Sequence, residues 1–170
     1  PYNIRIQSFY AQVLLGTRRY DDAIAAARKV LSVQPNTGLA MTALTAALHK
    51  KGLYDELLAL ERERWAKDPE ILEALEKGHQ EAGYPGAVKR LADVLAARYG
   101  KPGGPRAYIV ANSYARAGDI ERVIEWLEKA YEEHDNNMPY IGGNPHFDLV
   151  RDDPRFQDLL RRMKLPAGEV

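Results

Sequence analysis

Apolar residues recur at helical spacing along most of the chain, in segments that come in pairs separated by short polar turns. In the first pair, an apolar stripe within residues 4–14 is followed by a turn at 17–19 and by a second stripe within 20–31. Spacings of three and four residues place such side chains on one face of an α-helix. Pro35 then stands where a helix cannot continue. The pattern predicts two antiparallel helices joined by a tight turn.

The same pattern returns with a period of 34 residues. This interval separates Tyr20 from Tyr54 and Pro35 from Pro69, and residues 18–36 align with residues 52–70 without a gap. A fixed period of this length is typical of helical repeat proteins, in which each unit is one helix pair. Gly52 stands between the two helices of the second unit, where a left-handed backbone is easily accepted.

Two further helix pairs are predicted downstream. The third bends at residues 83–85 and ends in the Gly- and Pro-rich segment 100–105, the clearest break in the chain. The fourth bends at Gly118 and Asp119. The four predicted units span residues 3–36, 37–70, 71–102 and 104–137.

The C-terminal segment, residues 144–166, is predicted to form short capping helices. Asn144-Pro145 and Asp153-Pro154 each place a capping side chain directly before a proline in the first helical turn. Apolar residues that follow each proline can cover the open end of the last repeat, as terminal caps do in solenoids.

These patterns together predict an all-α fold, with about four antiparallel helix pairs in a right-handed superhelix and short C-terminal capping helices. We expect one domain over residues 1–170. A helical pattern is already running near Pro1, so we also expect the sequence to be a piece of a longer protein.

The repeat pattern resembles the tetratricopeptide repeat over roughly residues 3–134. The residues that carry the resemblance are Gly52, Tyr20, Tyr54, Ala23, Ala27, Pro35 and Pro69. The resemblance implies a superhelix of helix pairs whose function is protein–protein interaction. The family's clamp for C-terminal carboxylates is not expected here, because Ser8, Gln12 and Ala46 stand where that clamp needs lysine or asparagine.

The tail resembles the closing segment of tetratricopeptide arrays in some bacterial signalling proteins, including serine/threonine kinases and winged-helix regulators. The matching residues are Asp153, Pro154, Arg155, Phe156, Leu159, Leu160, Met163 and Pro166. This resemblance implies that the chain is the C-terminal part of a larger signalling or regulatory protein in the bacterial cytoplasm.

Charge and composition narrow the classes of partner. Lys+Arg and Asp+Glu both number 24, so the net charge of zero gives no reason to expect nucleic acid or an anionic membrane as partner. The absence of cysteine excludes disulfides, thiolate catalysis and cysteine-ligated metals. No apolar run approaches the ~20 residues of a membrane-spanning helix.

The sequence contains no recognisable catalytic motif, and we expect neither enzymatic activity nor a cofactor. His134, Asp135, His146 and Asp148 lie close in sequence, but their spacing matches no metal motif, so no metal site is predicted. The Gly-rich segment at 100–105 lacks the preceding strand and the Lys-Ser/Thr pair of a phosphate-binding loop.

Binding of a protein or peptide is the predicted function. In stacked helix pairs the first helix of each unit lines the concave surface, and a polar lining of mixed charge suits an extended peptide or a helix. The residues predicted to line this groove are Arg5, Ser8, Gln12, Thr42, His49, Lys50, Glu73, Lys77, Gln80, Tyr108, Asn112 and Arg116.

Two alternatives remain open on the sequence alone. The groove could bind a small molecule and so make the chain a sensory domain of a regulator. The outer face of the first unit could instead pair with a second copy as a weak homo-oligomer, because no cap is visible at the N-terminal end.

Overall fold

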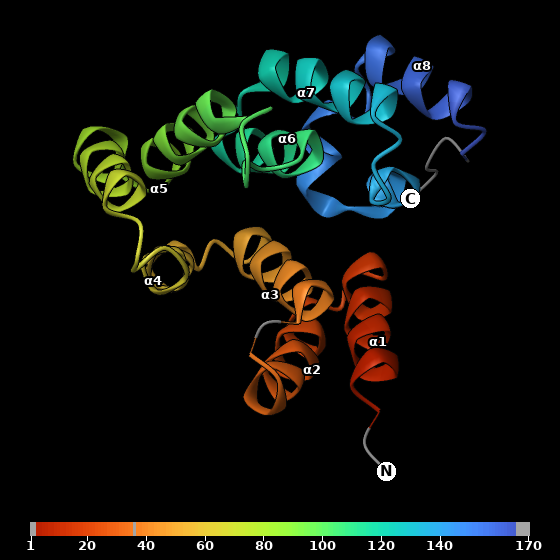
Figure 1. Cartoon of the computed structure of the whole chain (residues 1–170). Helices are drawn as coiled ribbons and strands as arrows, with labels where there is room; N and C mark the ends of the chain where they lie inside the picture. Colours follow the sequence, from red (N-terminus) through yellow and green to blue (C-terminus); the bar gives the residue numbers. More distant parts are fainter. Residues whose placement is uncertain (1–2, 36, 166–170) are drawn as a thin grey trace. The chain divides into compact units, whose positions relative to one another are not determined.

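The computed structural model describes residues 3–35 and 37–165 (Figure 1), which form α-helices and short 3-10 helices and no strand. The all-α prediction is confirmed for these residues. Asn36, which ends the first predicted unit, and Pro166, which was expected in the cap, lie outside them. In the same part of the chain, every helix is too short or too polar to cross a bilayer.

The chain divides into two compact units, residues 1–57 and 58–170, and the boundary falls inside the helix α4. Unit 1 contains three complete helices and the first turn of α4, and these are α1 (Ile4–Gly16), α2 (Tyr20–Val33), α3 (Gly38–Lys50) and α4 (Tyr54–Arg64).

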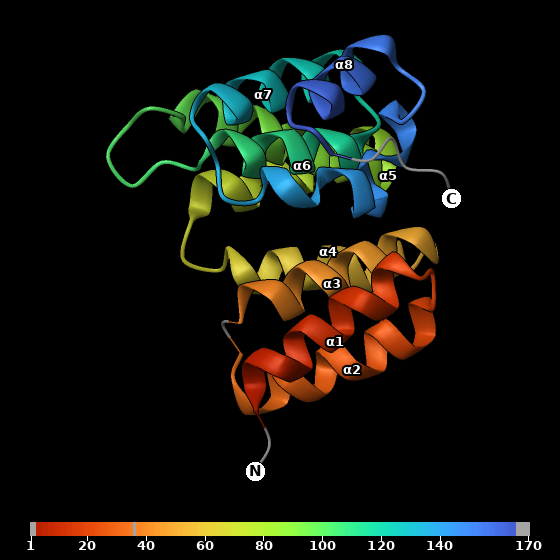
Figure 2. The same ribbon diagram turned by 90° about the vertical axis from the view of Figure 1, so that its right-hand side faces the viewer.

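Small side chains let the helices of unit 1 approach closely. Helix α1 packs against α2, and α3 packs against both (Figure 2). Ala11 of α1 and Ala23 and Ala27 of α2 are fully buried, as expected for the contact between paired helices. The turn predicted at residues 17–19 separates α1 from α2. Gly52, between α3 and α4, has the predicted left-handed backbone with φ of 69°.

Unit 2 is built around α6, which packs against α5 and α7. The short helix η2 contacts both α6 and α7, and α8 contacts α7. After the end of α4, the elements of this unit are α5 (Pro69–Arg98), α6 (Ala107–Ala117), α7 (Ile120–Glu132), η1 (Met138–Gly143), η2 (Pro145–Val150) and α8 (Pro154–Arg162).

Helix α5 is a hairpin of two helical arms. Ala82 and Gly83 have non-helical dihedral angles, and Gly83 has φ of 64°, a value that a residue with a Cβ rarely adopts. The bend predicted at residues 83–85 is therefore confirmed. The arms meet near the bend at Gly78 and Gly86, where a Cβ on Gly78 would lie 2.2 Å from the Gly86 carbonyl oxygen.

An ion pair joins the other end of the two α5 arms. The guanidinium of Arg98, in the last turn of the second arm, binds both carboxylate oxygens of Asp68, with Nη2 2.9 Å from Oδ1. Asp68 is also the N-cap of the first arm, since its Oδ1 accepts a hydrogen bond from the Ile71 amide at 3.2 Å. The Asp68 carboxylate thus caps the N-terminus of the first arm and binds Arg98 at the C-terminal end of the second arm.

The C-terminal caps form as the sequence predicts. The side chain of Asn144 accepts a hydrogen bond from the His146 amide at 3.0 Å, and that of Asp153 accepts one from the Arg155 amide at 2.9 Å. The first predicted capping helix, η2, is a 3-10 helix instead of an α-helix, and a second 3-10 helix, η1, precedes the predicted cap. Frequent proline and glycine favour such short, tight turns over a longer α-helix.

We predict that Gly78→Ala destabilises unit 2, because the added methyl group meets backbone atoms that cannot move aside independently. Overpacking of this kind lowers the free energy of unfolding by about 1–3 kcal/mol. The matched control is Gly16→Ala at the end of α1, where nothing lies within 4 Å of the added Cβ, and it should be neutral or slightly stabilising. Urea denaturation of both variants tests this, and an equal effect would contradict it.

Candidate functional site

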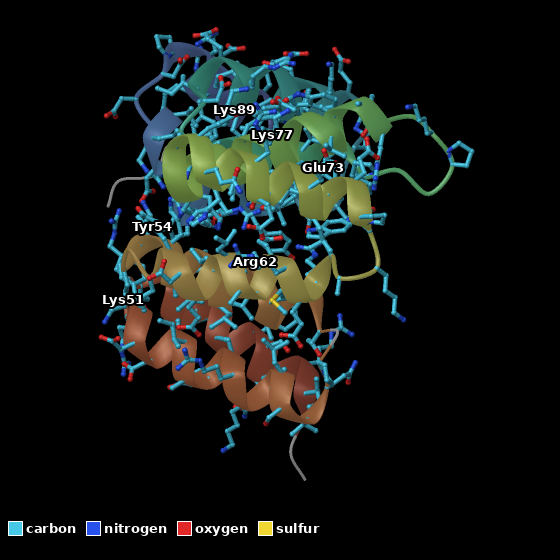
Figure 3. All side chains as sticks on the ribbon, turned by 90° about the vertical axis from the view of Figure 1, so that its left-hand side faces the viewer. Lys51, Tyr54, Arg62, Glu73, Lys77 and Lys89 are labelled. Carbon is cyan, nitrogen blue, oxygen red and sulfur yellow. The ribbon has the colours of Figure 1, made fainter. Side chains whose placement is uncertain are left out.

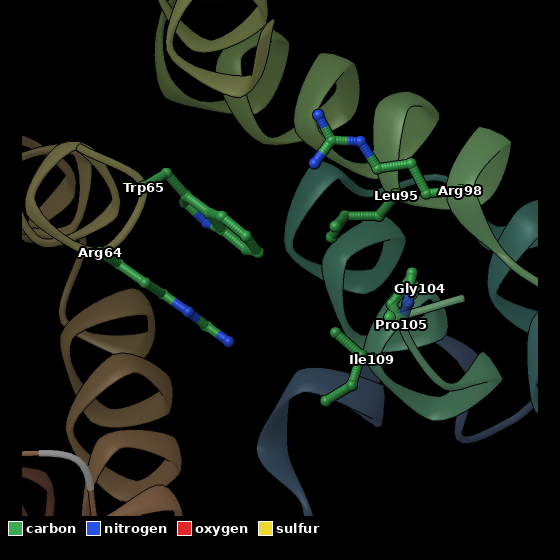
Figure 4. A pocket seen from close by; sticks show the side chains of 8 residues that line it. Arg64, Trp65, Leu95, Arg98, Gly104, Pro105 and Ile109 are labelled. Carbon is green, nitrogen blue, oxygen red and sulfur yellow. The ribbon is translucent and has the colours of Figure 1, made fainter. Parts of the chain in front are cut away.

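A cavity of about 210 Å³ opens in unit 2 where four elements meet. These are the end of α4 with the residue that follows it, the second arm of α5, the loop 103–105 and the start of α6 (Figure 4). The cavity, hereafter the Trp65 pocket, is lined by Arg64, Trp65, Leu95, Arg98, Gly103, Gly104, Pro105 and Ile109.

The inner walls of the Trp65 pocket are apolar. The indole of Trp65 projects from one side, and Leu95 and Ile109 lie on the other side (Figure 4). Leu95 is buried, whereas Trp65 and Ile109 are half-buried and so present part of their surface to the cavity. A site of this kind can take up an apolar group, and an aromatic wall adds a large contact area at little cost in conformational entropy.

The two arginines of the Trp65 pocket differ in their partners. Arg98 is bound by Asp68 and Glu70, and the hydrogen bonds to these carboxylates raise its pKa. Arg64 is exposed, and its guanidinium lies 5.1 Å from the centre of the Trp65 ring. No ion pair is made by Arg64 within the described part of the chain. Arg64 is therefore the cation that remains available to an incoming anionic group.

The loop wall of the pocket consists of backbone. A Cβ on Gly104 would lie 2.1 Å from the Arg98 carbonyl oxygen, so the loop passes directly over the end of α5. The Gly104 amide donates a hydrogen bond to the Lys101 carbonyl at 2.9 Å. This is the Gly-rich segment that the sequence marks as a break, and its glycines allow the loop to close the cavity.

A buried ion pair holds the tryptophan wall in place. Arg116 Nη1 of α6 lies 2.5 Å from Glu61 Oε1 of α4, and the two side chains are 5% and 2% exposed. The second oxygen, Glu61 Oε2, accepts a hydrogen bond from Trp65 Nε1 at 3.0 Å. Arg116 Nη1 also lies 3.5 Å from the hydroxyl of Tyr84. Glu61 therefore links α6 to the orientation of the indole.

Both members of the pair are charged at neutral pH. Burial alone would raise the pKa of Glu61, but the charge and hydrogen bond of Arg116, with smaller effects of Arg64 and Trp65, hold that pKa below its usual value. Burial would lower the pKa of Arg116, but the charge and hydrogen bond of Glu61, together with those of Tyr84, hold that pKa above its usual value. A lowered carboxylate pKa stabilises the fold above the unfolded-state pKa of about 4.3, and that stabilisation is lost as the pH falls through the folded-state value.

Three residues of the predicted groove are buried, namely Ser8, Tyr108 and Arg116, which are 1%, 7% and 6% exposed. The Ser8 hydroxyl donates to the Ile4 carbonyl at 2.7 Å. The Tyr108 hydroxyl accepts from Asn144 Nδ2 at 2.9 Å, and burial raises the pKa of Tyr108 to about 12. Arg116 forms the buried ion pair. These three side chains are therefore buried in the chain's own structure and offer little surface to a partner.

The other predicted groove residues fall in both units. In unit 1, the side chain of Gln12 donates to the Leu39 carbonyl at 2.6 Å, and that of Thr42 donates to the Gly38 carbonyl at 3.0 Å. His49 packs edge-on against Tyr54, with ring centres 5.7 Å apart. Also in this unit, Arg5 is exposed and Lys50 is half-buried.

In unit 2, Glu73 and Lys77 lie along the same side of the first arm of α5 (Figure 3) and are exposed, as is Gln80. Asn112 is half-buried on α6. None of these residues lines the Trp65 pocket, so the predicted set and the observed cavity do not coincide.

The two aspartates of the histidine- and aspartate-containing segment near the C-terminal end bind neighbouring residues of the chain. Asp135 Oδ1 accepts a hydrogen bond from the Asn137 amide at 2.8 Å. Asp148 pairs with Arg151 at 2.7 Å. His134 is exposed and His146 is buried. Among residues 3–35 and 37–165, no group of three or more histidine or acidic side chains is arranged to hold a metal ion.

Sequence reasoning missed the Trp65 pocket because its residues come from separate elements. From the sequence alone, Trp65 is interpreted as a core-packing residue, and Arg64 as part of a charged, solvent-exposed helix face. Two signals point to the site in retrospect. Glu61 and Trp65 have the i, i+4 spacing of a helical side-chain pair, and the glycines at 103 and 104 permit a close approach of the loop.

No protein-family model matches this sequence, and no curated protein or solved structure matches it significantly. The function must therefore be inferred from the chain's own residues.

We predict that Glu61→Gln lowers the free energy of unfolding by about 3–5 kcal/mol, because it leaves the charge of Arg116 buried without a counter-ion. The double variant Glu61→Met/Arg116→Met should recover most of that loss, since no charge is then buried. Urea denaturation followed by tryptophan fluorescence measures both.

Glu121→Gln is the control for this experiment, because it breaks an exposed ion pair with Arg155 and should change stability little. If Glu61→Gln were no more harmful than this control, the buried pair would not have the role assigned to it.

Proposed function

We propose that the chain is a protein-binding module in which the Trp65 pocket takes up one large side chain of a partner peptide. The helix pairs are proposed to form a tetratricopeptide-like right-handed superhelix, in line with the 34-residue period of the sequence. The observation that carries the proposal is the Trp65 pocket itself, a partly exposed aromatic wall beside an arginine without an ion-pair partner among the described residues.

The size of the pocket favours a peptide over a metabolite. Pockets for drug-sized molecules have volumes of about 300–1,000 Å³, whereas the Trp65 pocket has about 210 Å³. A cavity below that range suits a single side chain, whose own backbone remains outside. Peptide recognition commonly uses such an anchor, with further contacts made along the surrounding surface.

The charges around the pocket indicate what the peptide contains. Leu95 and Ile109 favour an apolar anchor, and Arg64 at the rim favours an adjacent acidic residue. Arg98 is not expected to contribute a second positive charge, because Asp68 and Glu70 neutralise it. We therefore infer a ligand motif in which a leucine, phenylalanine or similar residue stands next to aspartate or glutamate.

The wider setting of the module is part of the same proposal. The resemblance of the C-terminal segment to the end of tetratricopeptide arrays supports a larger bacterial signalling protein, located in the cytoplasm, as the parent molecule. In this setting the chain would recruit a partner protein and would catalyse no reaction of its own.

Selection from a random peptide display library tests this function. We expect the chain to enrich peptides with a large apolar residue beside an acidic one, bound with micromolar affinity. Trp65→Ala should weaken such peptides at least tenfold, because it removes one wall of the pocket. Arg64→Ala should weaken them less, and the difference from the unmodified chain should shrink at high salt.

Lys67→Ala is the matched control, since Lys67 is an exposed cation close to Arg64 in sequence but is not part of the pocket lining. Binding to each variant is measured by isothermal titration calorimetry, which does not depend on a tryptophan signal. The proposal fails if no peptide is enriched, or if enriched peptides bind the Trp65→Ala variant as tightly as the unmodified chain.

A further inference from the structure

Helix α1 carries a stripe of large apolar side chains on its solvent-exposed face. Ile6, Phe9, Tyr10 and Val13 are 62%, 41%, 50% and 60% exposed. Their spacings of three and four residues place them on one side of the helix. Scattered exposed apolar residues are common, but contiguous patches of this kind mark interaction surfaces. We call these four residues the α1 stripe.

The α1 stripe lies opposite the face with which the helix packs in its own unit. The buried residues of α1 are Ser8, Ala11, Leu14 and Leu15. At 100° per residue, the centre of this buried set is roughly 160° from the centre of the α1 stripe. Helices α2 and α3 therefore occupy one side of α1, and no residue among 3–35 and 37–57 covers the α1 stripe, whose side chains remain exposed.

The α1 stripe has the same pattern in both directions along the helix. Its sequence is aliphatic, aromatic, aromatic, aliphatic, and the intervals are three, one and three residues. Viewed down the helix, Ile6 and Val13 lie near the midline, and Phe9 and Tyr10 lie about 50° to either side of it. A surface that is unchanged by reversal fits a two-fold axis, because an isologous interface must match itself.

The charges on α1 are compatible with that symmetry. Arg5 is the only charged residue of α1. With a two-fold axis between residues 9 and 10, the Arg5 side chains of two antiparallel helices originate about 13 Å apart along the axis. This distance exceeds the screening length of about 8 Å at physiological salt. A parallel pair would instead place the two arginines at the same level.

We propose that the α1 stripe is the interface of a symmetric homodimer in which the α1 helices of two copies pack antiparallel. Ile6 then contacts Val13 of the second copy, and Phe9 contacts its Tyr10. The aromatic residues meet at the two-fold axis, where ring contacts add to the burial of apolar surface.

The area of the α1 stripe indicates a weak dimer. Its exposed side chains offer roughly 450 Å² per copy, about half of the ~800 Å² that each partner contributes to a standard interface. We therefore expect a dissociation constant on the order of 10–100 µM. Such a dimer carries two copies of the Trp65 pocket, and a partner with two binding motifs would gain affinity from their linkage.

Sedimentation velocity of the full chain from 1 µM to 1 mM tests the dimer. We expect a concentration-dependent monomer–dimer equilibrium that Tyr10→Asp shifts at least tenfold toward monomer. The matched control is Tyr140→Asp. Tyr140 is 58% exposed and lies outside the α1 stripe, so this variant should leave the monomer–dimer equilibrium unchanged. Circular dichroism confirms that both variants remain folded.

A charge exchange tests the antiparallel geometry. Ile6→Lys and Val13→Glu should each weaken association, because each places like charges near the interface. The double variant Ile6→Lys/Val13→Glu should restore association, since the opposite charges face each other twice across an antiparallel pair. A parallel pair would place like charges opposite each other and would stay dissociated.

Each outcome bears on the proposal directly. A strict monomer up to 1 mM overturns it, as does association that Tyr10→Asp leaves intact. Failure of the double variant to recover association overturns the antiparallel arrangement. Peptide binding at the Trp65 pocket is measured separately, and a monomeric Tyr10→Asp variant should keep its affinity for a peptide with one motif, so the two proposals fail independently.

Discussion

The buried ion pair between Glu61 and Arg116 is the interaction on which the arrangement of the Trp65 pocket depends. Burying two charges is expensive, and replacing such a pair with apolar residues often stabilises a protein. Arg116 Nε has no hydrogen-bond partner among the described residues, so the pair is not fully satisfied. What the pair contributes is the orientation of side chains. The Glu61 carboxylate binds the guanidinium of Arg116 with one oxygen and the indole of Trp65 with the other. An apolar pair would give stability without fixing the indole.

The position of α6 at the centre of unit 2 explains why a contact to this helix can organise a site. Its neighbours are the two-armed α5, α7 and η2, and further polar contacts tie it to them. The Tyr114 hydroxyl donates to Asp93 Oδ1 of α5 at 2.8 Å, and the Tyr108 hydroxyl accepts from Asn144 at 2.9 Å. Because α6 is held on several sides, the position of Arg116 is well defined. Glu61 of α4 binds Arg116, so the position of Trp65 in the pocket wall also depends on α6.

The sequence predicted the local structure well, whereas the Trp65 pocket could not be found from the sequence, for a physical reason. Helices, bends and caps depend on residues within a few positions of one another, so Gly83, Asn144 and Asp153 could be interpreted from their neighbours. A predicted groove requires knowledge of which helix faces are left uncovered, and periodicity only separates polar faces from apolar ones. Arg116 looks like a solvated residue, and its partner Glu61 is 55 residues away. The Trp65 pocket likewise joins four elements that no short-range pattern connects.

The two proposed surfaces compensate for each other's small size. A pocket that holds one side chain can supply only modest affinity, and an interface of half the standard area gives only a weak dimer. When both are engaged by a partner with two motifs, the second binding event becomes intramolecular, and the overall affinity can exceed that of one pocket by orders of magnitude. Binding would then respond steeply to the local concentration of the chain, because only the dimer offers two pockets. A module with weak elements of this kind can release its partner readily, which a single large interface would not allow.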